Sequence, residues 1–489
     1  MSQQNKSQLD QAQSFVESGK FDQAVNVYLN ILSDDSSDLD ALMGLGNCYL
    51  QLGDVSKAFE QFSTGRQLAP EATDFAFQYA NTLVLGGYQK EALAELQRAT
   101  GLCGNDPLFC LEIARLLIKL GEAQGALGIL DRLEELTPDG QVLMARAFCL
   151  QGEFSDAIAI LHRLRQELPE VAIFANELSL AAAYLGDYRL AVTNYEDYLN
   201  LSEPKSSDYL RFADLLLKTK NLERAEIALE QAKGEHTDLP GWFFVQAQIN
   251  RLKGDYLNAI ESCLTTLKLQ PTNAYAWSML IELVNKEDLL EHTDQLKTLL
   301  DKELFSTSHD KSQALFAMAR SFERQDDVSS SCNYLRKANS EVSKRLKLSG
   351  KAYIRKDYEN YVTDMISLFD KEFFQKTGTN HGASFGRPIF ILGLVRSGTT
   401  LVERLISQSN SVLSGGEQEA VPLVLDEYRR QHEMGNIGSI KQLNANEWSN
   451  LAVACQSRYT CDVNGVYTCL LYTSPSPRDL STSRMPSSA

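Results

Sequence analysis

Four glycines recur at one constant interval along the chain, at Gly19, Gly53, Gly87 and Gly121. Small residues keep the same interval at two further places, in the series Ala24, Ala58, Ala92, Ala126 and the series Ala12, Gly46, Ala80, Ala114. A fixed period of about 34 residues is typical of stacked pairs of helices. The glycine ends the first helix of each pair, because a left-handed backbone conformation is cheap there. The small residues let neighbouring helices cross closely, so the pattern predicts an α-solenoid.

Four units, 5–38, 39–72, 73–106 and 107–140, keep strict register. A fifth follows after a slightly shorter step, at Ala145, and later units are marked by Gly186, Ala213 and Gly254. The markers fade from about 274 to 340. The second unit contains LGNCYLQLGDVSKAFEQFSTGRQLAP, which resembles the tetratricopeptide repeat family. The resemblance implies a right-handed superhelix of about eight to nine repeats over 5–340, with a protein or peptide partner in its groove.

The net charge, the apolar runs and the cysteine spacing argue against several classes of binding partner and site. The net charge is −17, which argues against general binding to nucleic acid or to an anionic membrane. The start of the chain lacks the apolar core of a secretory signal, and no apolar run reaches the ~18 residues of a membrane span. The nine cysteines form no C-x-x-C pair, so we expect reduced core thiols, no metal site and a cytoplasmic protein.

The pattern changes towards the carboxyl end of the chain. Residues 341–385 are expected to be a helical linker and a loop, followed by a buried strand at 388–392. The run GLVRSGTT then leads into a helix with an apolar stripe at Leu401, Leu405 and Ile406. Strand, glycine loop and helix N-terminus together make a cradle for an anion. The predicted anion ligands are the guanidinium, hydroxyls and backbone of Arg396, Ser397, Gly398, Thr399 and Thr400.

Two interpretations of this loop imply different ligands. Gly393 and Gly398 have the spacing of a Walker A loop, but Thr399 stands where the phosphate-binding lysine belongs. The segment RPIFILGLVRSGTTLVERLISQSNSVLSGGE instead resembles the 5′-phosphosulfate loop of sulfotransferases, most closely the branch of the protein-tyrosine sulfotransferases. Proline is common before the arginine in that family, and Val395 replaces it here. The resemblance implies 3′-phosphoadenosine 5′-phosphosulfate as co-substrate and no metal.

Glu417 follows Arg396 at the offset where the tyrosine-sulfotransferase pattern has a catalytic glutamate. A carboxylate there can accept the proton of an attacking hydroxyl, while Arg396 balances charge on the transferred group. A helix N-terminal carboxylate is the structural alternative for Glu417. The catalytic prediction is therefore Glu417 with Arg396. Tyrosine, carbohydrate and small-molecule hydroxyls all stay open as acceptors.

The resemblance covers only the first part of a sulfotransferase domain, at 386–468, and no 3′-phosphate-binding segment is recognisable. The chain's last stretch, 469–489, turns Ser/Pro-rich and resembles translated sequencing-adapter read-through, so we expect a non-native tail and an inactive, partly ordered domain. Three functions are weighed: a sulfotransferase whose solenoid positions the acceptor, a repeat scaffold with an inactive C-terminal domain, and a nucleotide kinase or NTPase with a degenerate loop. No Walker B carboxylate supports the third.

Overall fold

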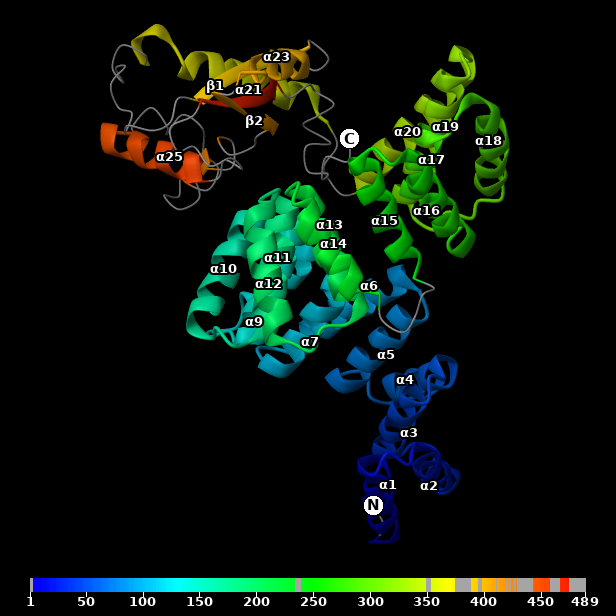
Figure 1. The fold of residues 1–489 in the computed structure, drawn as a ribbon. Coiled ribbons are helices and arrows are strands. Elements are labelled where there is room, and N and C mark those ends of the chain that lie inside the picture. Colours follow the sequence, from blue (N-terminus) through cyan, green and yellow to red (C-terminus); the bar gives the residue numbers. More distant parts are fainter. Residues whose placement is uncertain are drawn as a thin grey trace. The chain divides into compact units, whose positions relative to one another are not determined.

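The computed structural model of the chain describes residues 3–233, 239–348, 353–373, 388–394, 398–409, 411–417, 421, 424–425, 428, 443–457 and 467–474. The chain divides into two compact units, Met1–Ala181 and Ala182–Ala489. Helices make up most of the described residues in both units, and strands occur only near the carboxyl end (Figure 1). The architecture is therefore mainly α, as the sequence predicts.

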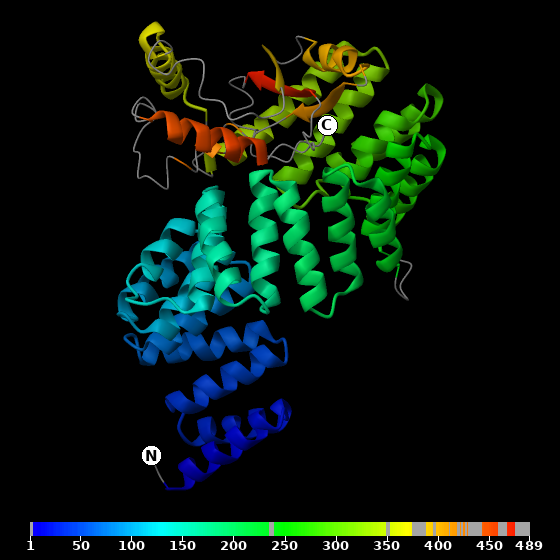
Figure 2. The ribbon, with the colours of Figure 1, turned by 60° about the vertical axis from the view of Figure 1, so that its left-hand side comes forward.

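The first unit is a stack of antiparallel helix pairs, one pair to each repeat (Figures 1 and 2). Its helices are α1 (Gln3–Glu17), α2 (Phe21–Asp34), α3 (Leu39–Gln51), α4 (Val55–Leu68), α5 (Thr73–Leu85), α6 (Gln89–Leu102), α7 (Pro107–Lys119), α8 (Ala123–Leu130), α9 (Pro138–Gln151) and α10 (Phe154–Glu167). Helix α11 (Ala172–Leu185) crosses the boundary between the units. The shorter step after the fourth repeat coincides with α8, which has only 8 residues.

The second unit continues the same pattern of helix pairs. Its helices are α12 (Tyr188–Leu201), α13 (Ser206–Lys218), α14 (Leu222–Gln231), α15 (Pro240–Lys253), α16 (Tyr256–Leu269), α17 (Ala274–Leu283), α18 (Lys286–Asp301), α19 (Ser308–Arg324), α20 (Val328–Leu348) and α21 (Arg355–Leu368). One hydrophobic core, which contains Trp277, Leu280 and Leu296, includes residues of every helix from α15 to α19. Regular packing therefore continues through the segment where the repeat markers fade.

The regularly spaced glycines adopt the conformation that the sequence predicts. All four have φ between 71° and 83°, in the left-handed region that ends the first helix of each pair. Lys220 occupies the same repeat position in the seventh unit and also has a left-handed φ, of 59°. The seventh repeat, in which lysine replaces the regularly spaced glycine, thus keeps the same turn geometry. The left-handed conformation of a residue other than glycine costs backbone strain.

Small residues are required where the helices cross. A Cβ added to Gly46 in α3 would lie 2.5 Å from Cε1 of Phe62 in α4. Phe62 is fully buried, and its ring fills the space beside the glycine. The close crossing of α3 and α4 therefore depends on the size of residue 46.

A small sheet follows the helical repeats. It consists, over the described residues, of β1 (Pro388–Leu394), β2 (Val412–Glu417) and β3 (Tyr467–Ser474), in the order β1-β3-β2 with both pairings parallel. The predicted boundary between residues 468 and 469 falls inside β3, because the strand continues to Ser474 and pairs with both other strands beyond that boundary. Residues 469–474 form part of β3, and residues 475–489 lie outside the described residues.

Helix α21 shares a core with the C-terminal segment. Leu368 of α21 packs with Val424, Leu443 and Leu451, the last of these in α25 (Ala445–Ser457). Phe373 meets the ring of Trp448 edge-on at a centroid distance of 6.0 Å. The second half of the expected linker thus packs with the part of the chain that follows it.

Candidate functional site

A strand comes before the predicted anion cradle and a helix comes after it. Strand β1 ends at Leu394, and α23 (Thr399–Ile406) begins soon after it. Gly398 precedes the helix with φ 90°, a conformation that L side chains rarely adopt. Arg396 and Ser397, two of the predicted ligands, lie outside the described residues. The described backbone has the predicted strand before them and the predicted helix after them.

The N-terminus of α23 offers backbone donors. Gly398 is its N-cap residue and makes no side-chain capping hydrogen bond. The first amides of a helix have no partner within the helix, so those at Thr399 and Thr400 point outwards from its N-terminus. Apart from its chain neighbours, no described residue has an atom within 4 Å of the position that a Cβ on Gly398 would occupy. Space and donors for an anion therefore exist at this end of α23.

Glu417 is the last residue of β2, and its side chain lies outside the described part. Its backbone pairs with Leu471 of β3, while Leu394 at the end of β1 pairs with Ser474. The three strands are parallel, so their carboxyl ends lie at one edge of the sheet. From strand spacing and rise, the Cα atoms of Glu417 and Leu394 are about 14 Å apart. The predicted base and the anion loop thus start from the same edge.

Helix α23 buries only part of its apolar stripe against the sheet. Ile406 packs against Ile391 of β1, as its apolar character predicts, and Val412 of β2 packs against the same residue. Leu401 and Leu405 are 62% and 57% exposed, whereas Glu403 is only 5% exposed. The apolar stripe is therefore only partly buried among the described residues. Glu403 is a buried carboxyl one turn into the helix that hydropathy alone did not single out.

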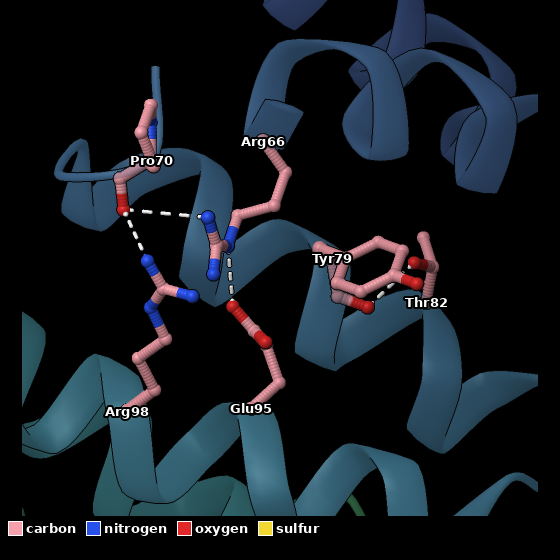
Figure 3. A network of polar contacts seen from close by, with 6 residues as sticks. All are labelled: Arg66, Pro70, Tyr79, Thr82, Glu95 and Arg98. Atoms are coloured by element: carbon pink, nitrogen blue, oxygen red, sulfur yellow. Dashed lines mark hydrogen bonds and ion pairs between the residues drawn. The ribbon is translucent and has the colours of Figure 1, made fainter. Parts of the chain in front are cut away.

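The polar side chains between neighbouring repeats are engaged in structural contacts (Figure 3). Arg66 donates from Nε to Glu95 Oε1 of the next repeat at 2.5 Å, and from Nη1 to the carbonyl of Pro70 at 3.3 Å. Arg98 donates to the same Pro70 carbonyl at 3.2 Å. The side chains of Arg66 and Glu95 are only 11% and 16% exposed. This network ties the second repeat to the third and satisfies the carbonyl of Pro70, just after α4.

The tyrosines of the sixth repeat divide between core and surface. Tyr195 is 1% exposed and lies 5.3 Å from the ring of Tyr198 and 6.1 Å from that of Phe212, measured between centroids. Burial raises the pKa of the Tyr195 hydroxyl. Tyr195 is therefore part of the packed core of this repeat. Tyr184 is 51% exposed.

Two absences hold for the described part of the chain. It contains no group of three or more histidine, cysteine, aspartate or glutamate side chains arranged to hold a metal ion. Among the helices that the structure describes, none combines the length and apolar character of a bilayer span.

Comparisons with known proteins agree with this division of the chain. Residues 9–73 match the model described as Tetratricopeptide repeat, and residues 388–474 match the model described as Sulfotransferase family. The second match begins with β1 and ends with β3, so it includes the whole described sheet. The chain thus combines an α-solenoid, whose residues 9–73 match the tetratricopeptide repeat model, with a C-terminal segment that matches a sulfotransferase family.

Relatives over longer stretches are distant. An uncharacterized protein of Aquifex aeolicus (strain VF5) is 26% identical over 381 residues, which is 77% of this chain and 46% of the relative. Intraflagellar transport protein 70A of Danio rerio is 28% identical over 145 residues, 29% of this chain and 22% of that protein. The chain therefore spans less than half the length of these relatives.

Similar solved structures include a tetratricopeptide repeat protein from Parabacteroides merdae ATCC 43184. It is 16% identical, with a TM-score of 0.42 over 51% of this chain and 98% of that one. Yeast Tom70 is 13% identical, with a TM-score of 0.34 over 76% of this chain and 98% of that one.

Proposed function

We propose that this protein is a sulfotransferase that transfers a sulfuryl group from 3′-phosphoadenosine 5′-phosphosulfate to an acceptor hydroxyl. The observation that carries the proposal is the left-handed, side-chain-free cap at Gly398 between β1 and α23, inside the segment that matches the sulfotransferase family. Amides aimed at one point from a helix N-terminus suit a phosphosulfate anion. The matched residues and the local backbone thus favour the same ligand.

In this proposal the loop holds the donor and Glu417 prepares the acceptor. The amides of Gly398, Thr399 and Thr400 and the hydroxyl of Ser397 bind the phosphosulfate oxygens. Arg396 balances the charge that develops as the sulfur–oxygen bond to the leaving phosphate breaks. Glu417, of the protein-tyrosine sulfotransferase pattern, accepts the proton of the acceptor hydroxyl as that oxygen attacks sulfur.

The position of Glu417 at the end of β2 is compatible with this role. About 14 Å between its Cα and the end of β1 leaves room for a sulfuryl group and an acceptor hydroxyl between the two side chains. The pairing of both strands with β3 fixes this separation.

The repeat solenoid has a separate role in the proposal. It binds a protein or peptide, which is either the acceptor or a partner that brings the acceptor. Exposed apolar side chains on its helices, such as Tyr184 and Leu150, suit such a ligand. We also propose a cytoplasmic location, since cysteines that are dispersed along the sequence without a C-x-x-C pair suit a reducing compartment.

Transfer of labelled sulfate from the donor to a panel of tyrosine peptides, carbohydrates and phenols tests the proposal. We expect Glu417→Gln to lower turnover by about 10²–10⁴. We expect Arg396→Ala to lower it by about 10²–10³. Arg404→Ala is the matched control, because Arg404 is an exposed arginine at the other end of α23. Sulfuryl transfer that survives both site substitutions would disprove these roles, and a chain that binds partners without any transfer would favour the scaffold alternative.

A further inference from the structure

Two cysteines face each other beneath the turn that joins the third repeat to the fourth. Cys103 follows the last residue of α6, and Cys110 lies in the first turns of α7. Their Sγ atoms are 3.9 Å apart, and the side chains are buried, with Cys110 fully so. Both thiols are free in the structure. Among the described residues, the other cysteines of the repeats make no such thiol–thiol contact.

We propose that Cys103 and Cys110 are a disulfide-forming pair, a redox modification site that reacts with small disulfides such as oxidised glutathione. A disulfide has an S–S length near 2.05 Å, so the two sulfur atoms must approach by about 1.9 Å. Side-chain rotation and a small movement of the turn can supply this distance. The bond would close a short ring across the α6–α7 turn.

The turn above the pair is exposed and reverses direction at a glycine. Residues Gly104, Asn105 and Asp106 are exposed above the buried thiols. Gly104 has φ 59°, so the chain reverses through a left-handed glycine. Its carbonyl lies 3.7 Å from Cys103 Sγ and 3.8 Å from Cys110 Sγ, so it orients both thiols. Local opening of this turn exposes the pair without unfolding either helix.

The burial of Cys110 and the exposed turn beside Cys103 determine which thiol reacts first. Burial, followed by the neighbouring Cys103 thiol, raises the pKa of Cys110 to about 11, which disfavours Cys110 as the first nucleophile. The guanidinium of Arg132, which donates to the carbonyl of Thr100 at 2.8 Å, acts in the opposite direction on the pKa of Cys110. Cys103 lies next to the exposed turn and is the first to react in this proposal.

The chemistry is a balanced thiol–disulfide exchange. The thiolate of Cys103 attacks one sulfur of oxidised glutathione, forms a mixed disulfide and releases one glutathione thiolate. The thiolate of Cys110 then attacks Cys103 Sγ, forms the internal disulfide and releases the second glutathione. Each cysteine gives up its proton to solvent or to a departing glutathione thiolate. The two protein thiols are oxidised together, and one oxidised glutathione is reduced to two thiols.

Peptide mapping of the full chain tests the proposal, because trypsin releases both cysteines in the single peptide 99–115. The chain is incubated with oxidised glutathione, quenched with acid and alkylated. We expect this peptide to carry no alkyl group and to be two hydrogen atoms lighter than the same peptide with both thiols reduced. Dithiothreitol should restore both alkylation sites. Cys48 and Cys263 are buried and serve as internal controls that should remain alkylated after denaturation.

Substitutions separate the two steps. Cys110→Ser should accumulate the mixed disulfide of glutathione on Cys103, because no second thiol can displace it. Cys103→Ser should leave Cys110 unmodified at the same oxidant concentration. Recovery of the wild-type 99–115 peptide with two alkylated cysteines, at an oxidant concentration that modifies exposed Cys332, would overturn the proposal. A disulfide between two chains in place of the internal one would also overturn it.

Discussion

Replacing Gly46 by alanine tests whether side-chain volume at the helix crossing, and not only the repeat pattern, determines how the solenoid packs. The repeat pattern alone predicts that Gly46→Ala is harmless, since alanine occupies this position in other repeats. The structure predicts the opposite, because the new Cβ would lie 2.5 Å from Cε1 and 2.6 Å from Cζ of the fully buried Phe62. Carbon atoms pack favourably only at about 3.5–4.0 Å, so the ring must move by about 1 Å.

The expected magnitude comes from two opposing terms. Alanine improves the helix by about 1 kcal/mol relative to glycine. Forcing a methyl group against a ring that cannot leave the core costs about 2–3 kcal/mol, the upper part of the range for overpacked cores. The balance of these two terms is a net loss of about 1–2 kcal/mol in the free energy of unfolding. For a unit of this size this lowers the melting temperature by about 2–8 °C.

The chain itself suggests the compensating change. In three later repeats alanine takes the position of Gly46 and leucine takes that of Phe62, in the combinations Ala80 with Leu96, Ala114 with Leu130 and Ala145 with Leu161. Combining Gly46→Ala with Phe62→Leu should therefore recover stability, with a coupling free energy of about 1 kcal/mol or more. Denaturant unfolding followed by circular dichroism measures all four members of the cycle.

A second glycine provides the control. Gly128 lies within α8, and no atom comes within 4 Å of the position of its missing Cβ. Gly128→Ala should therefore stabilise the chain by up to about 1 kcal/mol. If Gly46→Ala also stabilises the chain, or if its effect adds to that of Phe62→Leu without coupling, the steric reasoning is wrong.

Three further predictions concern other repeats. Glu95→Gln should lower the free energy of unfolding by about 1–3 kcal/mol, because it removes the charged partner of the largely buried Arg66, and thermal unfolding measures the loss. Burial, followed by a neighbouring arginine, lowers the pKa of His309 in the folded state. As the pH falls, the unfolded state therefore binds a proton at His309 before the folded state does. Unfolding measured against pH should therefore show stability falling as pH drops below about 6.5, and His309→Gln should weaken that slope. Lys220→Gly should raise the free energy of unfolding by about 0.5–1 kcal/mol, because glycine adopts the left-handed conformation without steric strain. An unchanged unfolding midpoint would contradict this prediction.

The sequence predicts the helix pairs well because their signals are local. Glycine at a left-handed turn and a small residue at a crossing reveal the repeat without knowledge of any contact, and all four regularly spaced glycines have the expected φ. The seventh repeat is weak in the sequence because Lys220 replaces the glycine, although the backbone keeps the same turn. The partner of each small residue, such as Phe62 for Gly46, depends on tertiary packing that the period does not contain.

The candidate site was only partly predictable. The strand and helix around Gly398 follow from hydropathy and glycine placement. The central position of β3 does not, because its partners β1 and β2 lie far before it in the chain. Burial of Glu403 in place of Leu401 depends on the rotation of α23 on the sheet. The thiol pair at Cys103 and Cys110 was missed because its spacing crosses a turn, where no helical or strand period applies.

Binding of the donor to the full chain tests the central claim most directly. The account requires the loop before α23 to hold 3′-phosphoadenosine 5′-phosphosulfate through its amides and Arg396. Equilibrium dialysis with the labelled donor should show binding that Arg396→Ala weakens by about tenfold or more, while Arg404→Ala leaves it unchanged. Equal affinity of the wild-type chain and Arg396→Ala, or no detectable binding by the wild-type chain, would contradict the account.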